Sequence, residues 1–248
     1  MSTAHRAALV TGAASGIGRA VAERLVKDGS DVLAVDLRPD SGGPGEQLEA
    51  DLTTREGNRA AVDTAIQLFG RLDIVVANAG FQHVAPVDEF PEDRWDALVA
   101  LLLTSPFLLA KYSWDALKSS GSGRFIAIAS AHGHVASPFK AAYVSAKHGV
   151  VGLVKVLGLE GAEYGIAAAA LCPGYVRTPM VEGQISAQAE AHAVAEDRVL
   201  TEVILAPQAI KRLIEPEEVA DMVSLLAGSH GELFTGAAVT MDMGWTAR

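Results

Sequence analysis

The chain has 248 residues, of which half are apolar and a fifth are charged, and its formal net charge at pH 7 is −10. This composition excludes a disordered chain and supplies enough apolar surface for a single domain over residues 1–248. The negative charge disfavours nucleic acid and membrane surfaces as partners. Because no uninterrupted apolar run reaches about 18 residues and the first residues lack the apolar segment of a signal peptide, we expect a cytoplasmic protein.

Short apolar segments alternate with longer segments of helical periodicity. Residues 17–25, which end before Gly29, have apolar side chains at helical spacing, and Pro216 with Glu217 and Glu218 is typical of a helix start. The strands are almost continuously apolar, which indicates burial on both faces. The pattern predicts an α/β fold of the Rossmann type, a doubly wound parallel sheet with helices on both faces. The predicted strands are residues 7–11, 31–36, 73–77, 124–130 and 166–172.

Residues 181–213 form a long stretch of helical periodicity without a strand. The stretch follows the 166–172 strand, where the chain leaves the carboxyl edge of the predicted sheet and where ligands bind in such folds. We therefore interpret it as a helical lid over the substrate. The alternative is a solvated helical insertion without function.

A glycine-rich loop, Thr11-Gly12-Ala13-Ala14-Ser15-Gly16-Ile17-Gly18, joins the first strand to the first helix. Glycine allows a sharp turn and a close approach to a pyrophosphate at the helix N-terminus. Asp36 ends the second strand, where a carboxylate can accept hydrogen bonds from the adenosine ribose and would repel a 2′-phosphate. These features favour NAD as cofactor, although Arg38 leaves NADP as an alternative. The alternative is that the glycines merely form a tight turn and that Asp36 caps a loop.

The loop pattern TGxxxGxG, together with Ala77-Asn78-Ala79-Gly80 after the 73–77 strand, resembles the short-chain dehydrogenase/reductase family. The resemblance covers essentially the whole chain. It implies that Asp51 and Leu52 flank the adenine and that Asn78 and Gly80 support the cofactor ribose. It also implies a homotetramer. The other cofactor contacts it implies are Gly12, Ser15, Gly16, Ile17, Gly18, Tyr143, Lys147, Pro173, Gly174, Val176 and Thr178.

Tyr143 and Lys147 are four residues apart in a predicted helix, so both side chains project from the same face. A phenol with a reference pKa of about 10 is a poor base at neutral pH, but an adjacent ammonium and the charge of an oxidised nicotinamide stabilise its phenolate. Ser130 can hydrogen-bond the substrate oxygen beside the tyrosine. The three residues resemble the catalytic group of the family, whereas a YxxxK pair alone is usually two surface residues.

Leu102 departs from the family pattern. The family usually has an asparagine in this long helix, which the resemblance assigns to a water-mediated proton relay from the lysine. Leucine can neither donate nor accept a hydrogen bond. We therefore expect slower turnover, and a non-catalytic dinucleotide-binding regulator is the alternative of a different class.

Five further segments, residues 81–86, 130–133, 140–143, 176–182 and 244–248, resemble the bacterial 3-hydroxybutyrate dehydrogenases, a branch of the same family. The resemblance implies a polar pocket for a small carboxylate. Lys140 can supply a cation, and neutral side chains can supply hydrogen bonds. Tyr175 and Trp245 would limit the length of the substrate. The predicted substrate contacts are Gln82, Ser130, His132, Lys140, Tyr143, Gln184 and Trp245.

The predicted function is reversible, NAD-dependent oxidation of (R)-3-hydroxybutyrate to acetoacetate. A short-chain reductase of another ketone or hydroxy compound is the nearest alternative. The sequence has no grouping of His, Asp or Glu at metal-ligand spacing, so we predict no catalytic metal. Cys172, the single cysteine, follows an apolar run and is interpreted as a small buried hydrophobe.

Overall fold

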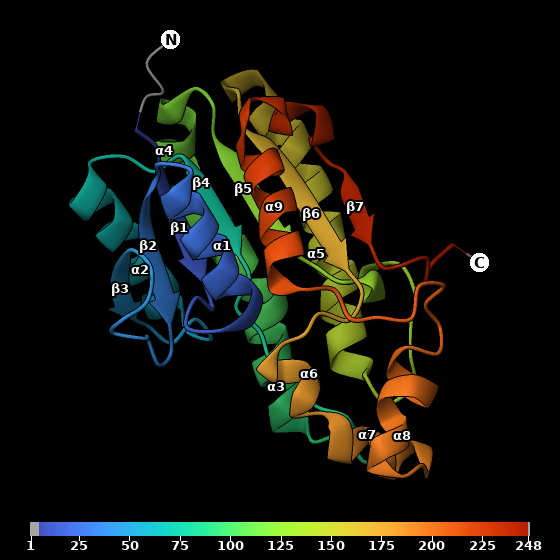
Figure 1. Cartoon of the computed structure of the whole chain (residues 1–248). Helices are drawn as coiled ribbons and strands as arrows, with labels where there is room; N and C mark the ends of the chain where they lie inside the picture. Colours follow the sequence, from blue (N-terminus) through green and yellow to red (C-terminus); the bar gives the residue numbers. More distant parts are fainter. Residues whose placement is uncertain (1–4, 248) are drawn as a thin grey trace.

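Seven parallel strands form one sheet in the computed structural model, which describes residues 5–247 (Figure 1). The strand order is β3-β2-β1-β4-β5-β6-β7, so the direction of winding reverses between β1 and β4. Such a reversal opens a crevice at the carboxyl ends of the strands. The strands are β1 (Ala7–Thr11), β2 (Asp31–Asp36), β3 (Glu46–Glu49), β4 (Ile74–Ala77), β5 (Arg124–Ile128), β6 (Ala167–Pro173) and β7 (Ala238–Met241).

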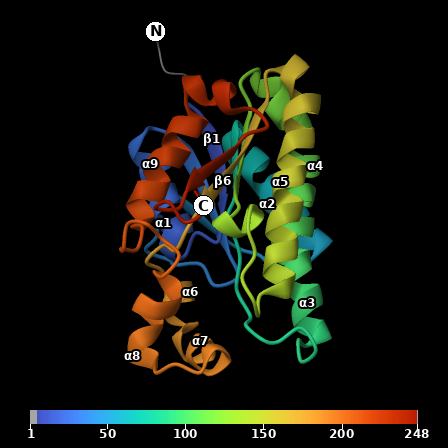
Figure 2. The ribbon, with the colours of Figure 1, turned by 90° about the vertical axis from the view of Figure 1, so that its right-hand side faces the viewer.

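Helices cover both faces of the sheet (Figure 2). Helices α1 (Gly16–Lys27) and α9 (Pro216–Ala227) pack on one face. Helices α2 (Arg55–Phe69), α4 (Ser105–Ser120) and α5 (Ala141–Gly161) pack on the other. The predicted doubly wound α/β fold is confirmed. Short 3-10 helices η2 (Ala131–Gly133), η3 (Ala162–Tyr164) and η5 (Ser229–Phe234) complete the connections.

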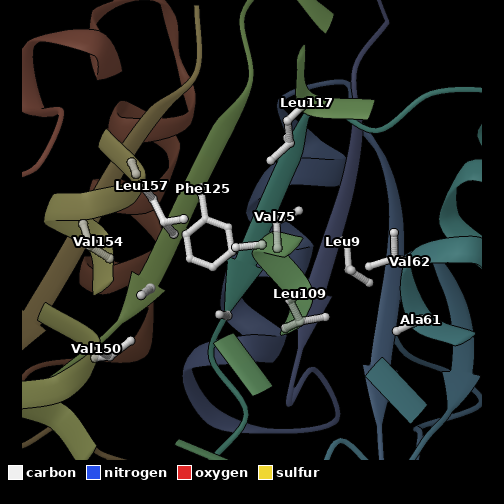
Figure 3. Packing of buried hydrophobic residues seen from close by; sticks show 14 of the residues in the cluster. Leu9, Ala61, Val62, Val75, Leu109, Leu117, Phe125, Val150, Val154 and Leu157 are labelled. Carbon is white, nitrogen blue, oxygen red and sulfur yellow. The ribbon is translucent and has the colours of Figure 1, made fainter. Parts of the chain in front are cut away.

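Successive strand residues point to opposite faces, so each strand contributes to two apolar clusters. Leu9, Val75 and Phe125 belong to the cluster under α2, α4 and α5 (Figure 3). Ala8 and Val10 belong to the cluster under α1 and α9. Burial on both faces explains why the central strands are continuously apolar. Cys172 is buried in the first cluster, as predicted.

All five predicted strands are present, with ends that differ by at most two residues. The sequence did not predict β3 and β7. They are the two edge strands, and neither contains a fully buried residue. In β3, Glu46 and Glu49 are exposed, so the strand lacks the apolar run by which the central strands were identified.

The segment after β6 lies beyond the carboxyl ends of the strands, at the bottom of Figure 1. It forms helices α6 (Pro179–Glu182), α7 (Ile185–His192) and α8 (Glu196–Val199), followed by a π-helical turn η4 (Leu200–Ile204). Residues 205–213 contain no helix, which differs from the predicted periodicity, because Pro207 cannot continue one. The segment has its own small apolar cluster, which includes Val199 and Ile204.

Helix α3 (Glu92–Val99) runs into α4 through a second π-helical turn, η1 (Ala100–Thr104). Leu102 lies in this turn, and such turns often occur at functional sites. By length and composition, Glu92–Ser120 and Ala141–Tyr164 are apolar enough to cross a membrane. This is weak evidence, because the core helices of soluble proteins have the same properties, and both stretches pack against the sheet here.

Candidate active site

A cavity of about 530 Å³ opens at the carboxyl edge of the sheet, between the glycine loop and the segment after β6. Its lining includes Asp36, at the end of β2, and Trp245, near the end of the chain. Nearly all residues predicted from the sequence line it. These are Gly12, Ser15, Gly16, Ile17, Asp36, Asn78, Gly80, Gln82, Ser130, His132, Lys140, Tyr143, Lys147, Pro173, Gly174, Val176, Thr178, Gln184 and Trp245.

Two positions of the glycine loop favour glycine, one because of close packing and one because of its backbone conformation. A Cβ atom at Gly18 would lie 2.0 Å from the carbonyl oxygen of Gly12, and Gly16 has a φ of +54°, which favours glycine. Asn78 holds the loop in place, because its Nδ2 donates hydrogen bonds to the carbonyl oxygens of Thr11 (2.8 Å) and Gly12 (3.2 Å). The result is a smooth backbone cradle at the start of α1, which fits a dinucleotide pyrophosphate.

Asp36 lies at the end of β2 beside this cradle. Its carboxylate accepts hydrogen bonds from the backbone N–H groups of Ala14 and Arg38, each at 3.1 Å. The side chain therefore holds the glycine loop and also presents negative charge to the cavity. A carboxylate here suits ribose hydroxyls and disfavours a phosphate.

Three predicted cofactor residues do not line the cavity. Gly18 lies behind the loop, and Leu52 is buried in the core under α2. Asp51 is exposed and accepts hydrogen bonds from the backbone N–H and the hydroxyl of Thr53, just before α2. The contacts of Asp51 and Leu52 with adenine stay predictions.

Ser130, Tyr143 and Lys147 line the same cavity. Ser130 follows β5, and the other two project from the first turns of α5. Ser130 lies close enough to Tyr143 to lower the pKa of the phenol. The Lys147 ammonium lies 5.5 Å from the centre of the Tyr143 ring and donates a hydrogen bond of 2.6 Å to the carbonyl oxygen of Ile128. The sequence could not indicate Ile128, because this contact uses its backbone.

Burial dominates the electrostatics of these groups. It raises the pKa of Tyr143 to about 12, against the opposing effect of the Ser130 hydrogen bond, and it lowers the pKa of Lys147 to about 8. Tyr143 is therefore a weak acid in the protein alone. A phenolate here needs a further positive charge in the cavity, which an oxidised nicotinamide would provide.

Lys140 lines the cavity together with Tyr175 and Trp245. It is only 3% exposed, and its Nζ donates a hydrogen bond of 3.0 Å to the hydroxyl oxygen of Tyr175. Tyr175 stacks on Trp245, with ring centres 5.5 Å apart, and His132 contacts the Trp245 ring edge-on. Burial lowers the pKa of Lys140 to about 8. A buried ammonium without a carboxylate partner among the described residues suits an anionic ligand.

The two predicted glutamines both line the cavity, and each already makes a hydrogen bond to the backbone. Gln82 Oε1 accepts a hydrogen bond of 2.9 Å from the backbone N–H of His83. Gln184 Nε2 donates to the carbonyl oxygen of Met180 at 2.8 Å, whereas its Oε1 is buried with no hydrogen-bond partner among the described residues. An amide nitrogen has two N–H groups, so Gln184 Nε2 keeps a second donor that could bond to a substrate carboxylate.

Leu102 forms an apolar part of the cavity wall. It is 2% exposed and packs with Ala142, Ala146 and Tyr143. Among residues 5–247, no group of three or more His, Cys, Asp or Glu side chains is arranged to hold a metal ion. The cavity thus places a phenol that could transfer a proton, Tyr143, in the same lining as a buried ammonium that could bind an anion, Lys140.

The sequence model of the short chain dehydrogenase family matches residues 6–189, more than half of the chain. The chain belongs to this family. It is an oxidoreductase, and the family implies a nicotinamide dinucleotide cofactor and a small-molecule substrate. The glycine cradle, Asp36 and the central tyrosine fit such a cofactor.

Several known proteins are similar over nearly the full length. The chain is 43% identical to the uncharacterized oxidoreductase YxjF of Bacillus subtilis, over 97% of this chain and 98% of that protein. It is 41% identical to the D-beta-hydroxybutyrate dehydrogenase of Rhizobium meliloti, over 98% and 99%. The ligand-free aldohexose dehydrogenase of Thermoplasma acidophilum superposes with a TM-score of 0.89 at 26% identity, over 98% of this chain and 95% of that chain.

Proposed function

We propose that this enzyme oxidises (R)-3-hydroxybutyrate reversibly to acetoacetate, with NAD as the hydride acceptor. The observation that carries the proposal is the buried Lys140 ammonium in the same cavity as Ser130 and Tyr143. A short 3-hydroxy acid has its anionic and reacting groups close together, which matches this arrangement. The 41% identity to a D-beta-hydroxybutyrate dehydrogenase supports the same substrate.

The chain's own residues bind the acid and move one proton. Bound NAD supplies the acceptor for a hydride from the substrate carbon. Tyr143 Oη takes the hydroxyl proton, Ser130 positions the reacting oxygen, and Lys147 stabilises the phenolate. Lys140 binds the carboxylate, with His132, Gln82 and Gln184 as further hydrogen-bonding partners. Pro173, Gly174, Val176 and Thr178 would surround the nicotinamide.

The segment of residues 181–213 is proposed to act as a lid. Its first helices begin directly after the cavity residues Val176 and Thr178, and Gln184 belongs to both the segment and the cavity wall. Closure would exclude water and bring the second N–H of Gln184 Nε2 toward the carboxylate. Tyr175 and Trp245 would limit the substrate to a short chain. We also propose a single catalytic domain and a cytoplasmic location, on the basis of the length and composition, and a homotetramer, on the basis of the family resemblance.

The test is cofactor reduction by the purified protein with (R)-3-hydroxybutyrate, its mirror isomer and neutral 2-butanol, each with NAD and NADP. We expect activity with the (R)-acid and NAD only. Faster turnover of the neutral alcohol would indicate another short-chain oxidoreductase. If the protein binds NADH but turns over no substrate, the alternative to which Leu102 points, a dinucleotide-binding regulator, replaces the proposal.

Asp36→Asn should shift the cofactor preference toward NADP. The amide keeps an acceptor for the Ala14 N–H, but it loses the negative charge that repels a 2′-phosphate. We expect kcat/KM with NAD to fall about tenfold and kcat/KM with NADP to rise about tenfold, as for a hydrogen bond to a charged group. The exposed Asp88 gives a matched control, Asp88→Asn, which should change neither value. A parent enzyme that already prefers NADP would contradict the assignment of Asp36.

A further inference from the structure

A series of hydrogen-bonding side chains leads from Ser130, next to Tyr143, through His132 to Ser137. Ser130 lies close enough to Tyr143 to lower the pKa of the phenol, and the His132 ring lies 5.8 Å from the Tyr143 ring, centre to centre. Ser130 Oγ lies 3.4 Å from Nδ1 of His132, and Nε2 of the same ring lies 3.0 Å from Oγ of Ser137. The backbone N–H of His132 also donates to Ser130 Oγ at 3.2 Å, which holds the ring beside the serine.

The series ends at a second, smaller cavity. This cavity has a volume of about 70 Å³ and is lined by Ser137 and the polar side chains of Gln188 and His192, among others. A water molecule needs about 10–15 Å³ of such volume and at least two polar partners. Ser137 is itself partly exposed, so its hydroxyl can reach solvent-connected water.

The side of the tyrosine that faces α4 offers no such route. Leu102 packs with Ala142 and Ala146 next to Tyr143, and none of these side chains can carry a proton. Lys147 is 5% exposed, and its hydrogen bond goes to the carbonyl oxygen of Ile128, a pure acceptor. A proton on Tyr143 therefore has a polar path through Ser130 and an apolar barrier at Leu102.

We propose that His132 and Ser137 form a proton relay that connects Tyr143 and Ser130 to the smaller cavity. The relay rests on the proposed alcohol oxidation. In each turnover the carbon-bound hydrogen leaves as hydride to the oxidised dinucleotide, and the hydroxyl proton moves to Tyr143 Oη. Tyr143 then protonates Ser130 Oγ as Ser130 gives its own proton to His132 Nδ1. His132 releases the proton on Nε2 to Ser137, which passes its own proton to water.

The state of the His132 ring suits this role. Burial, together with the positive charge of Lys140, lowers the pKa of His132 to about 3, so the ring is neutral. A neutral imidazole has one donor and one acceptor nitrogen and can pass a proton by accepting on one side and releasing on the other. His132 also lines the larger cavity at the predicted carboxylate site, so its substitution would affect substrate binding as well as the relay. Ser137 lines the smaller cavity and not the larger one, so its substitution tests the relay separately from substrate binding.

The test compares Ser137→Ala with Ser137→Thr, which retains the hydroxyl. We expect Ser137→Ala to lower kcat for (R)-3-hydroxybutyrate about tenfold and to leave KM within about twofold. This loss is smaller than the contribution, about 10²–10⁴-fold, of a group that exchanges the proton with the substrate directly. In a stopped-flow single turnover, a pH indicator should show proton release that lags NADH formation, whereas the two should coincide in the parent and in Ser137→Thr. Imidazole buffer should restore the rate of Ser137→Ala.

A purely structural role of Ser137 would slow NADH formation and proton release together, without rescue by imidazole, and would overturn the relay. Unchanged kcat in Ser137→Ala, with the parent active, would also overturn the relay and leave the proposed function intact. If the parent enzyme reduces NAD with none of the hydroxy acids tested, both the relay and the proposed function are overturned. The exposed Ser119 on α4, whose hydroxyl donates a hydrogen bond to the Asp115 carbonyl oxygen, provides a matched control as Ser119→Ala.

Discussion

Tyr143→Phe should lower kcat by about 10³-fold, because the residue is the proposed proton acceptor and general acid–base groups contribute about 10²–10⁴-fold. Phenylalanine retains the buried ring beside Ala146 and the ring contact with Lys147, so the fold and the cavity should be preserved. NADH binding, followed by fluorescence, should therefore remain within about threefold of the parent. A variant that keeps more than about a tenth of the parent kcat would place the proton acceptor elsewhere.

The matched control is Tyr164→Phe. Tyr164 is exposed at the end of η3 and does not line the cavity, and its ring lies under the Lys118 ammonium. We expect no change in kcat from this substitution. The contrast between the two tyrosines separates loss of a reacting hydroxyl from a general loss of stability, which thermal unfolding of both variants would report.

The central strands and the glycine loop could be predicted because their positions in the fold require particular residue types. Burial on both faces requires an apolar run such as that of β1, and the close contact between Gly18 and Gly12 requires glycine. The edge strands β3 and β7 could not be predicted, since an edge strand is paired on one side only and tolerates residues such as Glu46.

The candidate site shows the same division. Ser130, Tyr143 and Lys147 were predictable because the chemistry needs those side chains at that spacing. The hydrogen bond from Lys147 to Ile128 uses a backbone carbonyl, and Ser137 reaches His132 only through the course of a loop. Contacts of this kind depend on tertiary geometry and have no pattern in the sequence.

Leu102, in place of the usual asparagine of the family, changes the polarity of the cavity wall without removing the local backbone turn. The π-helical turn η1 is present, and Leu102 still faces the cavity, but its side chain makes the wall apolar. Ser130, Lys147 and the His132 ring lie next to Tyr143, and Ser130 and His132 continue into the hydrogen-bonded series that ends at Ser137. Because the wall at Leu102 is apolar, a proton that leaves Tyr143 has its polar route through this series.

Lys140→Met should abolish the selection of an acid over a neutral alcohol. Methionine is similar in length and apolar, so it fills the space beside Tyr175 without a charge. Loss of one partner of a buried charge pair costs about 2–5 kcal/mol, so we expect kcat/KM for (R)-3-hydroxybutyrate to fall at least about 30-fold. The value for 2-butanol should stay constant or rise. The exposed Lys155 on α5 gives the control Lys155→Met, which should affect neither substrate.

The same lysine predicts how substrate selection depends on pH. Burial lowers the pKa of Lys140 to about 8, so in the free enzyme its ammonium is present below this pH and is lost as the pH rises through it. Titration of Tyr143 and Lys147 changes kcat/KM by the same factor for the acid and for the neutral alcohol, so its effect cancels when one value is divided by the other. The ratio of kcat/KM for the acid to that for 2-butanol should therefore be constant below about pH 7 and fall about tenfold per unit well above pH 8. A ratio that does not change between pH 6 and 10 would mean that the carboxylate is bound by neutral donors such as Gln82 and not by Lys140.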